Sequence, residues 1–324
     1  MKKNFLKMSI FLLAALLIVA TSCKKDDGQE EPEPTVNYYQ TMTEYMAAND
    51  LDLTDVITNW IITAHDLDSL GVENFHIIDL RSSEDFNAGH IEGAHNTTLS
   101  NILNEAANAN GKPIVVVCYT GQTAAYGLTA LRLSGYSDSK ILKFGMSSWH
   151  PDFDRWTPNI GNIAVGHQNW STTNTIQPNV TFSLPTFTTT ATTGAEILAE
   201  RVQFMLETGF QGVNASDVLE TPTNYFINNY WSEADVNTYG HIVGAYRIKE
   251  DLSLASGGFK YLDKDATIVT YCWTGQTASA ITAYLIVLGY DAKALKFSAN
   301  AMIYDQLQSH KWTAPGNYPY VTSN

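Results

Sequence analysis

Two cysteines, Cys118 and Cys272, begin near-identical segments and are the residues best suited to nucleophilic chemistry. The first segment reads Cys-Tyr-Thr-Gly-Gln-Thr-Ala and the second reads Cys-Trp-Thr-Gly-Gln-Thr-Ala. Each follows an apolar, β-branched run, at residues 114–117 or 268–271, and precedes a helical pattern that ends at a glycine. We therefore predict that each half of the chain contains a strand, a cysteine loop and a helix, in that order.

A cysteine in such a loop has surroundings that favour a negative charge on sulfur. Backbone N–H groups converge at a helix N-terminus, and the helix macrodipole is positive there. We therefore expect a lowered thiol pKa and a thiolate that attacks sulfur, phosphorus or carbon electrophiles. The same converging N–H groups, called the anion cradle below, would also hold a persulfide anion. The expected loop residues are Tyr119, Thr120, Gly121, Gln122 and Thr123 in the first half and Trp273, Thr274, Gly275, Gln276 and Thr277 in the second.

Composition and charge describe a globular, acidic chain. It has 324 residues, 44% apolar and 16% charged, and is long enough for two domains with a core each. The formal net charge of −14 argues against nucleic acid as a partner. Three cysteines exclude a disulfide-rich scaffold, and Cys118 and Cys272 lack the neighbouring cysteines or histidines of a zinc site. We therefore expect no metal and no cofactor.

The N-terminus has the pattern of a bacterial lipoprotein. Residues 1–22 combine early lysines with an apolar run too short to span a bilayer, which is typical of a signal peptide. The ending Val-Ala-Thr-Ser-Cys resembles a lipobox, so Cys23 is the expected lipidation site; the alternative is an ordinary cleavage site that a cysteine happens to follow. Residues 23–37 read as a flexible acidic tether. We expect an exported protein, anchored by lipid alone to the cell envelope, at the outer membrane of a Gram-negative bacterium and on its periplasmic or surface-exposed side.

Three signatures occur twice in the same order, which predicts an internal repeat. They are an early Ala-x-Asp turn, at residues 64–66 and 215–217, a Gly-His-Ile turn, at residues 89–94 and 240–245, and the cysteine loop. The repeat predicts a first domain at 38–156, a linker at 157–193 and a second domain at 194–324. Within the linker we expect an edge strand over 179–184, and from Gly194 a helix with one apolar face. Alternating strands and helices predict α/β domains, each a mostly parallel sheet flanked by helices.

Further residues of the first half make a pattern that resembles the rhodanese family of sulfurtransferases. They are Ile78, Asp79, Arg81, Glu84 and Phe86, the run from Gly89 to Ala94, the cysteine loop, and Gly145 with Trp149. The resemblance spans both halves and implies two tandem rhodanese-like domains. It also implies a cysteine that takes a sulfane sulfur from a small-molecule donor, holds it as a persulfide and passes it to a thiophilic acceptor such as a thiol.

The second half departs from this pattern and reads as partly degenerate. Asn229 stands where the first half has Asp79, and Trp231 stands in place of Arg81. Ser298 replaces Gly145, and the tryptophan of the first half has no counterpart. We therefore expect Cys118 to be the principal reactive residue and Cys272 the second.

The supporting residues allow more than one interpretation. Asp79 and Arg81 are expected to form a structural ion pair at the strand end rather than to act on substrate. His90 and His241 are expected to hydrogen-bond neighbouring backbone in their turns. Tyr119 and Trp273 either line the mouth of a pocket or serve as packing residues.

Several other functions compete with sulfur transfer. Phosphatase-like loops of the Cys-x5-Arg type end on an arginine that binds phosphate, but Ala124 occupies that position, which argues against phosphatase and arsenate reductase activity. The loop carries no basic residue, so a persulfide, a polysulfide or another donor of low charge is expected over thiosulfate. Buried unreactive cysteines, a disulfide between Cys118 and Cys272, and a non-catalytic binding or interaction module at the envelope remain open alternatives.

Overall fold

The computed structural model describes residues 37–173 and 175–323. The predicted signal peptide at 1–22, the lipidation site Cys23 and all but the last residue of the tether lie outside the described residues. No helix of the described part has both the length and the apolar character needed to cross a membrane. The described residues from Asn37 onward belong to one compact unit, so the predicted boundary between two domains stays a prediction.

The first half contains a five-stranded parallel sheet with the order β1-β5-β4-β2-β3. Its strands are β1 (Ile61–Ile62), β2 (His76–Asp79), β3 (His95–Asn96), β4 (Ile114–Val117) and β5 (Lys140–Leu142). All residues of β2 and β4 are buried, because helices cover both faces of the sheet, as their apolar sequences require. The predicted strand at 114–117 is confirmed, and Cys118 directly follows its carboxyl end.

Alternate residues of β4 face two different sets of helices. Ile114 and Val116 belong to the core that α5 and α6 cover, whereas Val115 and Val117 pack with residues of α3 and α7. The helices of this half are α1 (Tyr38–Ala48), α2 (Leu53–Val56), α3 (Ala64–Ser69), α4 (Ser83–Ala88), α5 (Ile102–Ala106), α6 (Gln122–Leu133) and α7 (Met146–Trp149).

The second half repeats this arrangement with a four-stranded parallel sheet in the order β7-β11-β10-β8. Its strands are β7 (Gly212–Val213), β8 (Phe226–Asn229), β10 (Ile268–Tyr271) and β11 (Ala292–Leu295). Its helices are α8 (Gly194–Thr208), α9 (Ala215–Glu220), α10 (Glu233–Tyr239), α11 (Gln276–Leu288) and α12 (Ser298–Met302). Outside this sheet, β6 (Trp170–Ser171) pairs with β9 (His241–Ile242) in an antiparallel ribbon. The predicted α/β class with parallel sheets flanked by helices is confirmed.

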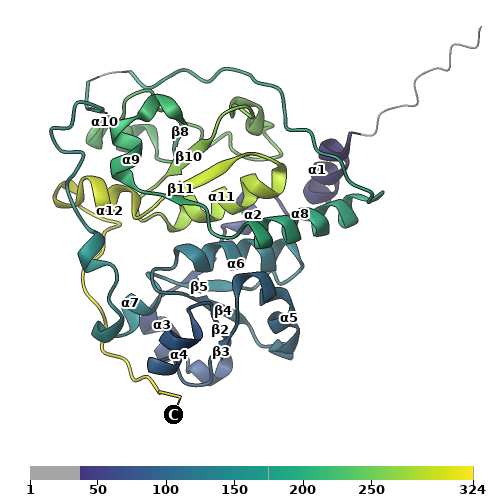
Figure 1. The fold of residues 1–324 in the computed structure, drawn as a ribbon, viewed down its shortest axis with the longest axis vertical. Coiled ribbons are helices and arrows are strands. Elements are labelled where there is room, and N and C mark those ends of the chain that lie inside the picture. Colours follow the sequence, from purple (N-terminus) through teal and green to yellow (C-terminus); the bar gives the residue numbers. More distant parts are fainter. Residues whose placement is uncertain (1–36, 174, 324) are drawn as a thin grey trace, which may run out of the picture. The chain divides into compact units, whose positions relative to one another are not determined.

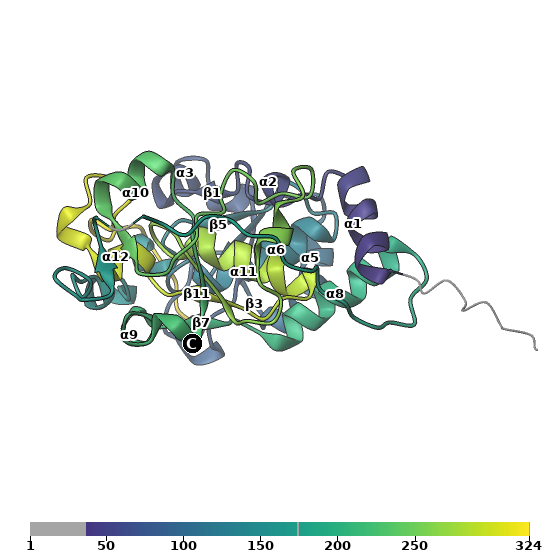
Figure 2. The same ribbon diagram turned by 90° about the horizontal axis from the view of Figure 1, so that it is seen from above.

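The two halves meet through the helices that follow the cysteine loops. Figure 1 shows α6 and α11 lying side by side between the two sheets, and Figure 2 shows α8 running beside them toward α1. A single apolar core includes side chains from both halves, among them Leu131 of α6 and Leu285 of α11. Almost every residue of α11 is buried, which explains why its sequence is apolar on all sides. The predicted helix from Gly194 is also confirmed, and its apolar face is buried.

The linker differs from what the sequence predicts, and the C-terminal segment makes contacts that the sequence does not reveal. The edge strand predicted over 179–184 is wrong, because this segment forms no strand and pairs only through the Phe182 N–H, which donates to the Lys260 carbonyl at 2.7 Å. Phe182 is half-buried, with its ring 5.8 Å from that of Phe226, whereas the other side chains of 179–184 are exposed. The C-terminal residues return to the first half, where Val321 and His90 exchange two backbone hydrogen bonds of 2.9 Å (Figure 1).

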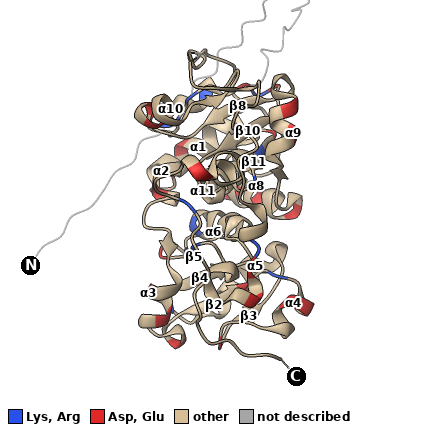
Figure 3. Ribbon diagram, turned by 90° about the vertical axis from the view of Figure 1, so that its left-hand side faces the viewer, with Lys and Arg blue, Asp and Glu red and all other residues tan. Residues whose placement is uncertain are grey.

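Acidic residues outnumber basic ones, at 33 Asp and Glu against 19 Lys and Arg. Figure 3 shows the acidic positions spread over several outer helices, such as α4 and α9, rather than gathered on one face. The acidic excess is therefore a general property of the surface and does not mark one site.

Candidate active site

The Cys118 sulfur lies at the N-terminus of α6, where two backbone N–H groups point at it. The Gly121 nitrogen is 3.1 Å and the Ala124 nitrogen 3.4 Å from the Cys118 Sγ atom. Gly121 is the N-cap of α6 and has a φ of 79°, a conformation that glycine adopts without strain. The loop therefore forms the predicted anion cradle, although the second donor is Ala124, one residue beyond the predicted loop.

The short helix α7 holds the outer side of this loop. The Met146 N–H donates to the Cys118 carbonyl at 2.8 Å, and the Ser147 N–H and Oγ both donate to the Tyr119 carbonyl. Gly145, the N-cap of α7, has a φ of 61° and a ψ of −155°. A Cβ atom at Gly145 would lie 2.2 Å from the Cys118 carbonyl oxygen, so the close approach of α7 requires glycine.

Asp79 and Arg81 form the expected ion pair at the end of β2. The Arg81 Nη2 atom is 2.6 Å from Asp79 Oδ2, and both side chains are almost fully buried. The same Nη2 donates to the Gly89 carbonyl at 2.7 Å, which ties the strand end to the Gly-His-Ile turn. The pair braces the scaffold that carries the cysteine loop, in agreement with a structural role.

Tyr119 connects the cysteine loop to charged residues from other elements. Its hydroxyl donates to Asp85 Oδ1 at 2.6 Å, and the guanidinium groups of Arg81 and Arg155 lie 5.2 and 4.9 Å from its ring centre. The Ser82 hydroxyl and the Tyr119 hydroxyl both lower the pKa of the Asp85 carboxyl by hydrogen bonding. Sequence reasoning missed Arg155, because nothing in its spacing links it to the loop. Positive charge therefore reaches the site from outside the uncharged loop.

The expected depression of the Cys118 pKa is wrong. Burial raises the pKa of the Cys118 thiol, because the side chain is only 5% exposed and the thiolate would lose its hydration. Hydrogen bonds from the backbone of Ala124, Thr120 and Gly121 act in the opposite direction, and the negative charge of Asp79 adds to the increase. The sequence pattern revealed the N–H donors but not the depth at which the sulfur is buried.

The raised pKa predicts the pH dependence of Cys118 reactivity. The thiolate fraction at pH 7 is smaller than that of free cysteine, whose pKa is about 8.5, and it grows about tenfold per pH unit below the pKa of the site. We expect the alkylation rate of Cys118, measured by intact mass in a Cys272→Ser variant, to keep rising beyond the pH at which N-acetylcysteine levels off. A plateau below pH 7 would instead show that the backbone donors outweigh burial.

The second half forms the same cradle around Cys272. The Gly275 and Ala278 nitrogens are 3.2 and 3.4 Å from the Cys272 Sγ atom, which matches the first half closely. Ser298 stands in place of Gly145, and its hydroxyl accepts a hydrogen bond of 3.1 Å from the Cys272 N–H. A side chain therefore helps to hold the second cysteine loop at a position where the first half has a glycine. Cys272 is 2% exposed, so its sulfur is also enclosed.

Aromatic side chains replace the ion pair in the second half. The Trp231 ring, at the position of Arg81, stacks on Trp273 with centroids 4.4 Å apart. Asn229, at the position of Asp79, donates from Nδ2 to the Tyr271 hydroxyl at 2.7 Å. The second cysteine therefore has the backbone cradle without the charged side chains that stand beside the first. The Trp273 ring also stacks with the His310 ring, with centroids 5.4 Å apart, and Trp273 is half-buried.

The two cysteine loops contact each other where α6 meets α11. The Gln122 Oε1 atom accepts a hydrogen bond of 3.1 Å from the Phe297 N–H, and Gln276 Nε2 donates to the Thr120 carbonyl at 3.3 Å. Both glutamine side chains are buried. A Cβ atom at Gly121 would lie 2.0 Å from Gln276 Nε2. The glutamines of the repeated motif thus join the two sites, whereas Thr123 and Thr277 are half-exposed.

Other sequence predictions have clear outcomes. The His90 Nδ1 atom lies 2.9 Å from the Phe86 carbonyl, and His241 Nδ1 lies 2.9 Å from the Ile242 carbonyl, as expected of turn-stabilising residues. Cys118 and Cys272 are both free, so the alternative of a disulfide between them is wrong.

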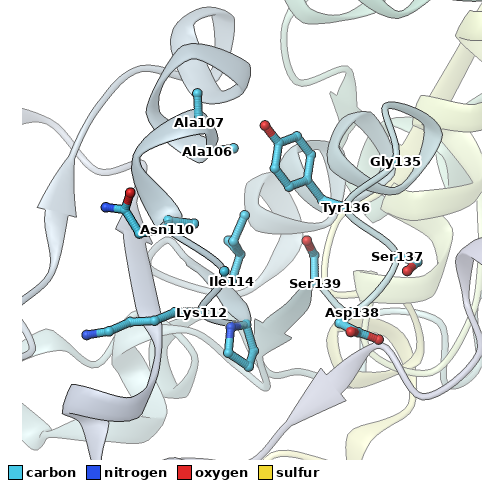
Figure 4. Close-up of a pocket in the computed structure, with 13 residues that line it drawn as sticks. Ala106, Ala107, Asn110, Lys112, Ile114, Gly135, Tyr136, Ser137, Asp138 and Ser139 are labelled. Carbon is cyan, nitrogen blue, oxygen red and sulfur yellow. The ribbon is translucent and has the colours of Figure 1, made fainter.

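A surface pocket of about 360 Å³ lies at the other end of the first sheet (Figure 4). Its lining includes Lys112 and Ile114 at the start of β4, and Tyr136 and Ser139 between α6 and β5. Cys118 follows the opposite end of β4, so this pocket belongs to a different part of the molecule from the cysteine loop.

Comparison with known proteins identifies one family. A family model described as a rhodanese-like domain matches residues 63–152 and 220–302, which places one match and one cysteine loop in each half. The thiosulfate sulfurtransferase GlpE of Shewanella oneidensis is 35% identical over 79 residues, which cover 24% of this chain and 78% of that protein. The uncharacterized protein YibN of Escherichia coli K12 is 32% identical over 81 residues, which cover 24% of this chain and 57% of that protein.

Comparison with solved structures also finds sulfurtransferases, at low identity and low TM-score. The thiosulfate sulfurtransferase from Pseudomonas aeruginosa aligns with 86% of this chain and 49% of its own, at 14% identity and a TM-score of 0.31. The 3-mercaptopyruvate sulfurtransferase from Leishmania major aligns with 77% of this chain and 75% of its own, at 12% identity and a TM-score of 0.28.

Proposed function

Because the chain belongs to the family of rhodanese-like domains, we propose that it is a sulfurtransferase in which Cys118 carries the transferred sulfur as a persulfide. The observation that carries this proposal is the convergence of the Gly121 and Ala124 N–H groups on the Cys118 Sγ atom. Such donors stabilise the anionic sulfur in both the thiolate and the persulfide. Cys272, in an equivalent cradle, is proposed as a second carrier.

The transfer proceeds in two steps that need no external oxidant. The Cys118 thiolate, after losing its proton to solvent, attacks the outer sulfur of the donor. The S–S bond of the donor breaks, and the leaving group, sulfite from thiosulfate or a thiolate from a persulfide, departs with the electron pair. A thiolate or cyanide then attacks the outer sulfur of the Cys118 persulfide, breaks the new S–S bond and restores the Cys118 thiolate.

The charge around the loop bears on the class of donor. The loop is uncharged, but the exposed Arg155 lies beside Tyr119, and Arg81 lies on the same ring. Asp79 neutralises Arg81, so Arg155 is the cation that supports a small anionic donor such as thiosulfate, alongside the persulfides that the uncharged loop favours. We propose a small-molecule sulfur donor and a thiol acceptor as the partners, with no nucleic acid.

The site of action is proposed from the N-terminal sequence. A lipid on Cys23 and a tether to residue 37 would hold the sulfurtransferase at the cell envelope, at the outer membrane of a Gram-negative bacterium. Metabolic labelling with an alkyne fatty acid, compared between the wild type and Cys23→Ser, tests this part. Label that persists in the variant would contradict it.

Sulfur loading and turnover test the proposed chemistry. The wild type, Cys118→Ser, Cys272→Ser and the double variant are incubated with thiosulfate or with a small-molecule persulfide, and transfer to cyanide is measured together with intact mass. We expect the wild type to gain one sulfur atom at Cys118, with a second at Cys272 if that residue is also a carrier, and to turn over. Cys118→Ser should lose the sulfur at Cys118 and most of the turnover.

The matched cysteine variants separate the possible results. Partial activity in each single variant and none in the double variant would support two working carriers. A wild type that gains no sulfur from either donor, while both thiols remain reactive toward alkylation, would overturn the proposed function.

A further inference from the structure

Three potential metal ligands gather on the first sheet, away from the cysteine loop. His76 begins β2, His95 begins β3 and Glu105 lies on α5, which packs against β2. One ligand atom from each residue lies within 4.8 Å of the other two. His76 Nε2 is 3.1 Å and His95 Nδ1 is 3.5 Å from the same carboxylate oxygen, Glu105 Oε1.

Two of these atoms are buried without a hydrogen-bond partner. His76 is 5% exposed, and its Nε2 atom lies 3.1 Å from Glu105 Oε1 without forming a geometrically good hydrogen bond to it or to another group. Buried polar atoms are normally paired, and leaving one unpaired costs about 1–3 kcal/mol. A cation between the two atoms would satisfy both at once.

The spacing suits a small cation with nitrogen and oxygen ligands. Zinc binds histidine nitrogen at about 2.0–2.1 Å and carboxylate oxygen at about 2.0–2.2 Å, which places neighbouring tetrahedral ligands about 3.3 Å apart. The two distances to Glu105 already bracket this value. The His95 side chain is 53% exposed and can turn to shorten its distance to His76.

We propose that His76, His95 and Glu105 bind one divalent transition-metal ion, with Zn²⁺ as the expected occupant. Two imidazoles and one carboxylate are a ligand set that zinc uses, and a fourth position remains for water. No motif in the sequence indicates this site, because its ligands are separated by many residues and meet only in the folded domain.

The ion would act on stability rather than on sulfur chemistry. His76 begins β2 and Asp79 ends it, so the site lies about 10 Å along the strand from the ion pair near Cys118. Its ligands come from β2, from the neighbouring two-residue edge strand β3, and from α5. A bound ion would therefore fasten the edge strand β3 and the helix α5 to β2, which is hydrogen-bonded to the central strand β4.

Titration of the metal-free protein with Zn²⁺ and Co²⁺ tests the proposal. We expect one ion per chain by calorimetry, a rise in Tm with Zn²⁺, and a cobalt spectrum without a thiolate charge-transfer band. His95→Ala and Glu105→Gln, which alter partly exposed side chains, should each raise the dissociation constant at least about tenfold. His65→Ala, an exposed histidine of α3, is the matched control and should bind as the wild type does.

The results that would overturn the proposal are equally direct. A wild type with no saturable binding, a thiolate band in the cobalt spectrum, or unchanged affinity in both His95→Ala and Glu105→Gln would each refute it. Far-UV circular dichroism of the variants confirms that they are folded before affinity is compared.

Discussion

Gly145→Ala is expected to reduce sulfur loading at Cys118 by at least about 100-fold, because it displaces the loop that positions the sulfur. The new methyl group would lie 2.2 Å from the Cys118 carbonyl oxygen and 2.7 Å from the Thr120 nitrogen. Both are backbone atoms, so no side-chain rotation relieves the overlap. The φ of 61° and ψ of −155° at Gly145 are also a combination that only glycine adopts readily. Intact mass after incubation with a persulfide measures the loss.

Gly111→Ala is the matched control for this substitution. Gly111 has a φ of 83°, so an alanine there meets the same left-handed strain, but no atom lies within 4 Å of the added Cβ. We expect a cost of about 1–2 kcal/mol in stability and no change in sulfur loading. Equal loading in Gly145→Ala and Gly111→Ala would show that the contact between α7 and the loop does not position Cys118.

Arg81→Met is expected to lower the free energy of unfolding by about 3–5 kcal/mol, since it leaves the Asp79 carboxylate buried without its partner. The two side chains are 0% and 1% exposed, and Arg81 also donates to the Gly89 carbonyl. Urea unfolding followed by tryptophan fluorescence measures the change. The double variant Asp79→Asn with Arg81→Met should recover part of the loss, because it removes the buried charge as well.

Arg247→Met provides the control for loss of an arginine. Arg247 pairs with Glu250, whose side chain is 58% exposed, so its removal should cost at most about 1 kcal/mol. If Arg81→Met costs no more than Arg247→Met, the buried pair does not brace the strand end. If the double variant is no more stable than Arg81→Met alone, the loss comes from packing rather than from the unpaired charge.

The bounds of the strands before the two cysteines, and the start of the helix at Gly194, could be predicted from the sequence to within a residue. The strands at 114–117 and 268–271 and the helix from Gly194 follow directly from apolar runs, turn glycines and a helical period. These signals are local, because they depend on residues that are neighbours along the chain. The strand predicted over 179–184 was wrong because the signal was local. Alternating apolar residues do not reveal whether a partner strand is within reach.

Some of the chemistry of the site could likewise be predicted from local sequence, and some depended on the tertiary structure. The repeated Thr-Gly-Gln-Thr-Ala motif determined that each sulfur meets the backbone N–H groups of a helix, because the loop length and the glycine specify that turn. The sequence did not determine the direction of the Cys118 pKa shift, because desolvation depends on every element packed around the sulfur.

By itself, the sequence determined the duplicated strand, loop and helix, the two cysteines and the ion pair of the first half. Only the tertiary structure brought Arg155 to Tyr119, joined the two loops through Gln122 and Gln276, and placed His76, His95 and Glu105 around one point. The physical reason is that patterns in a sequence report interactions over one or two turns or strands. Burial, charge and ligand geometry instead arise from segments that are distant in the chain and adjacent only after folding.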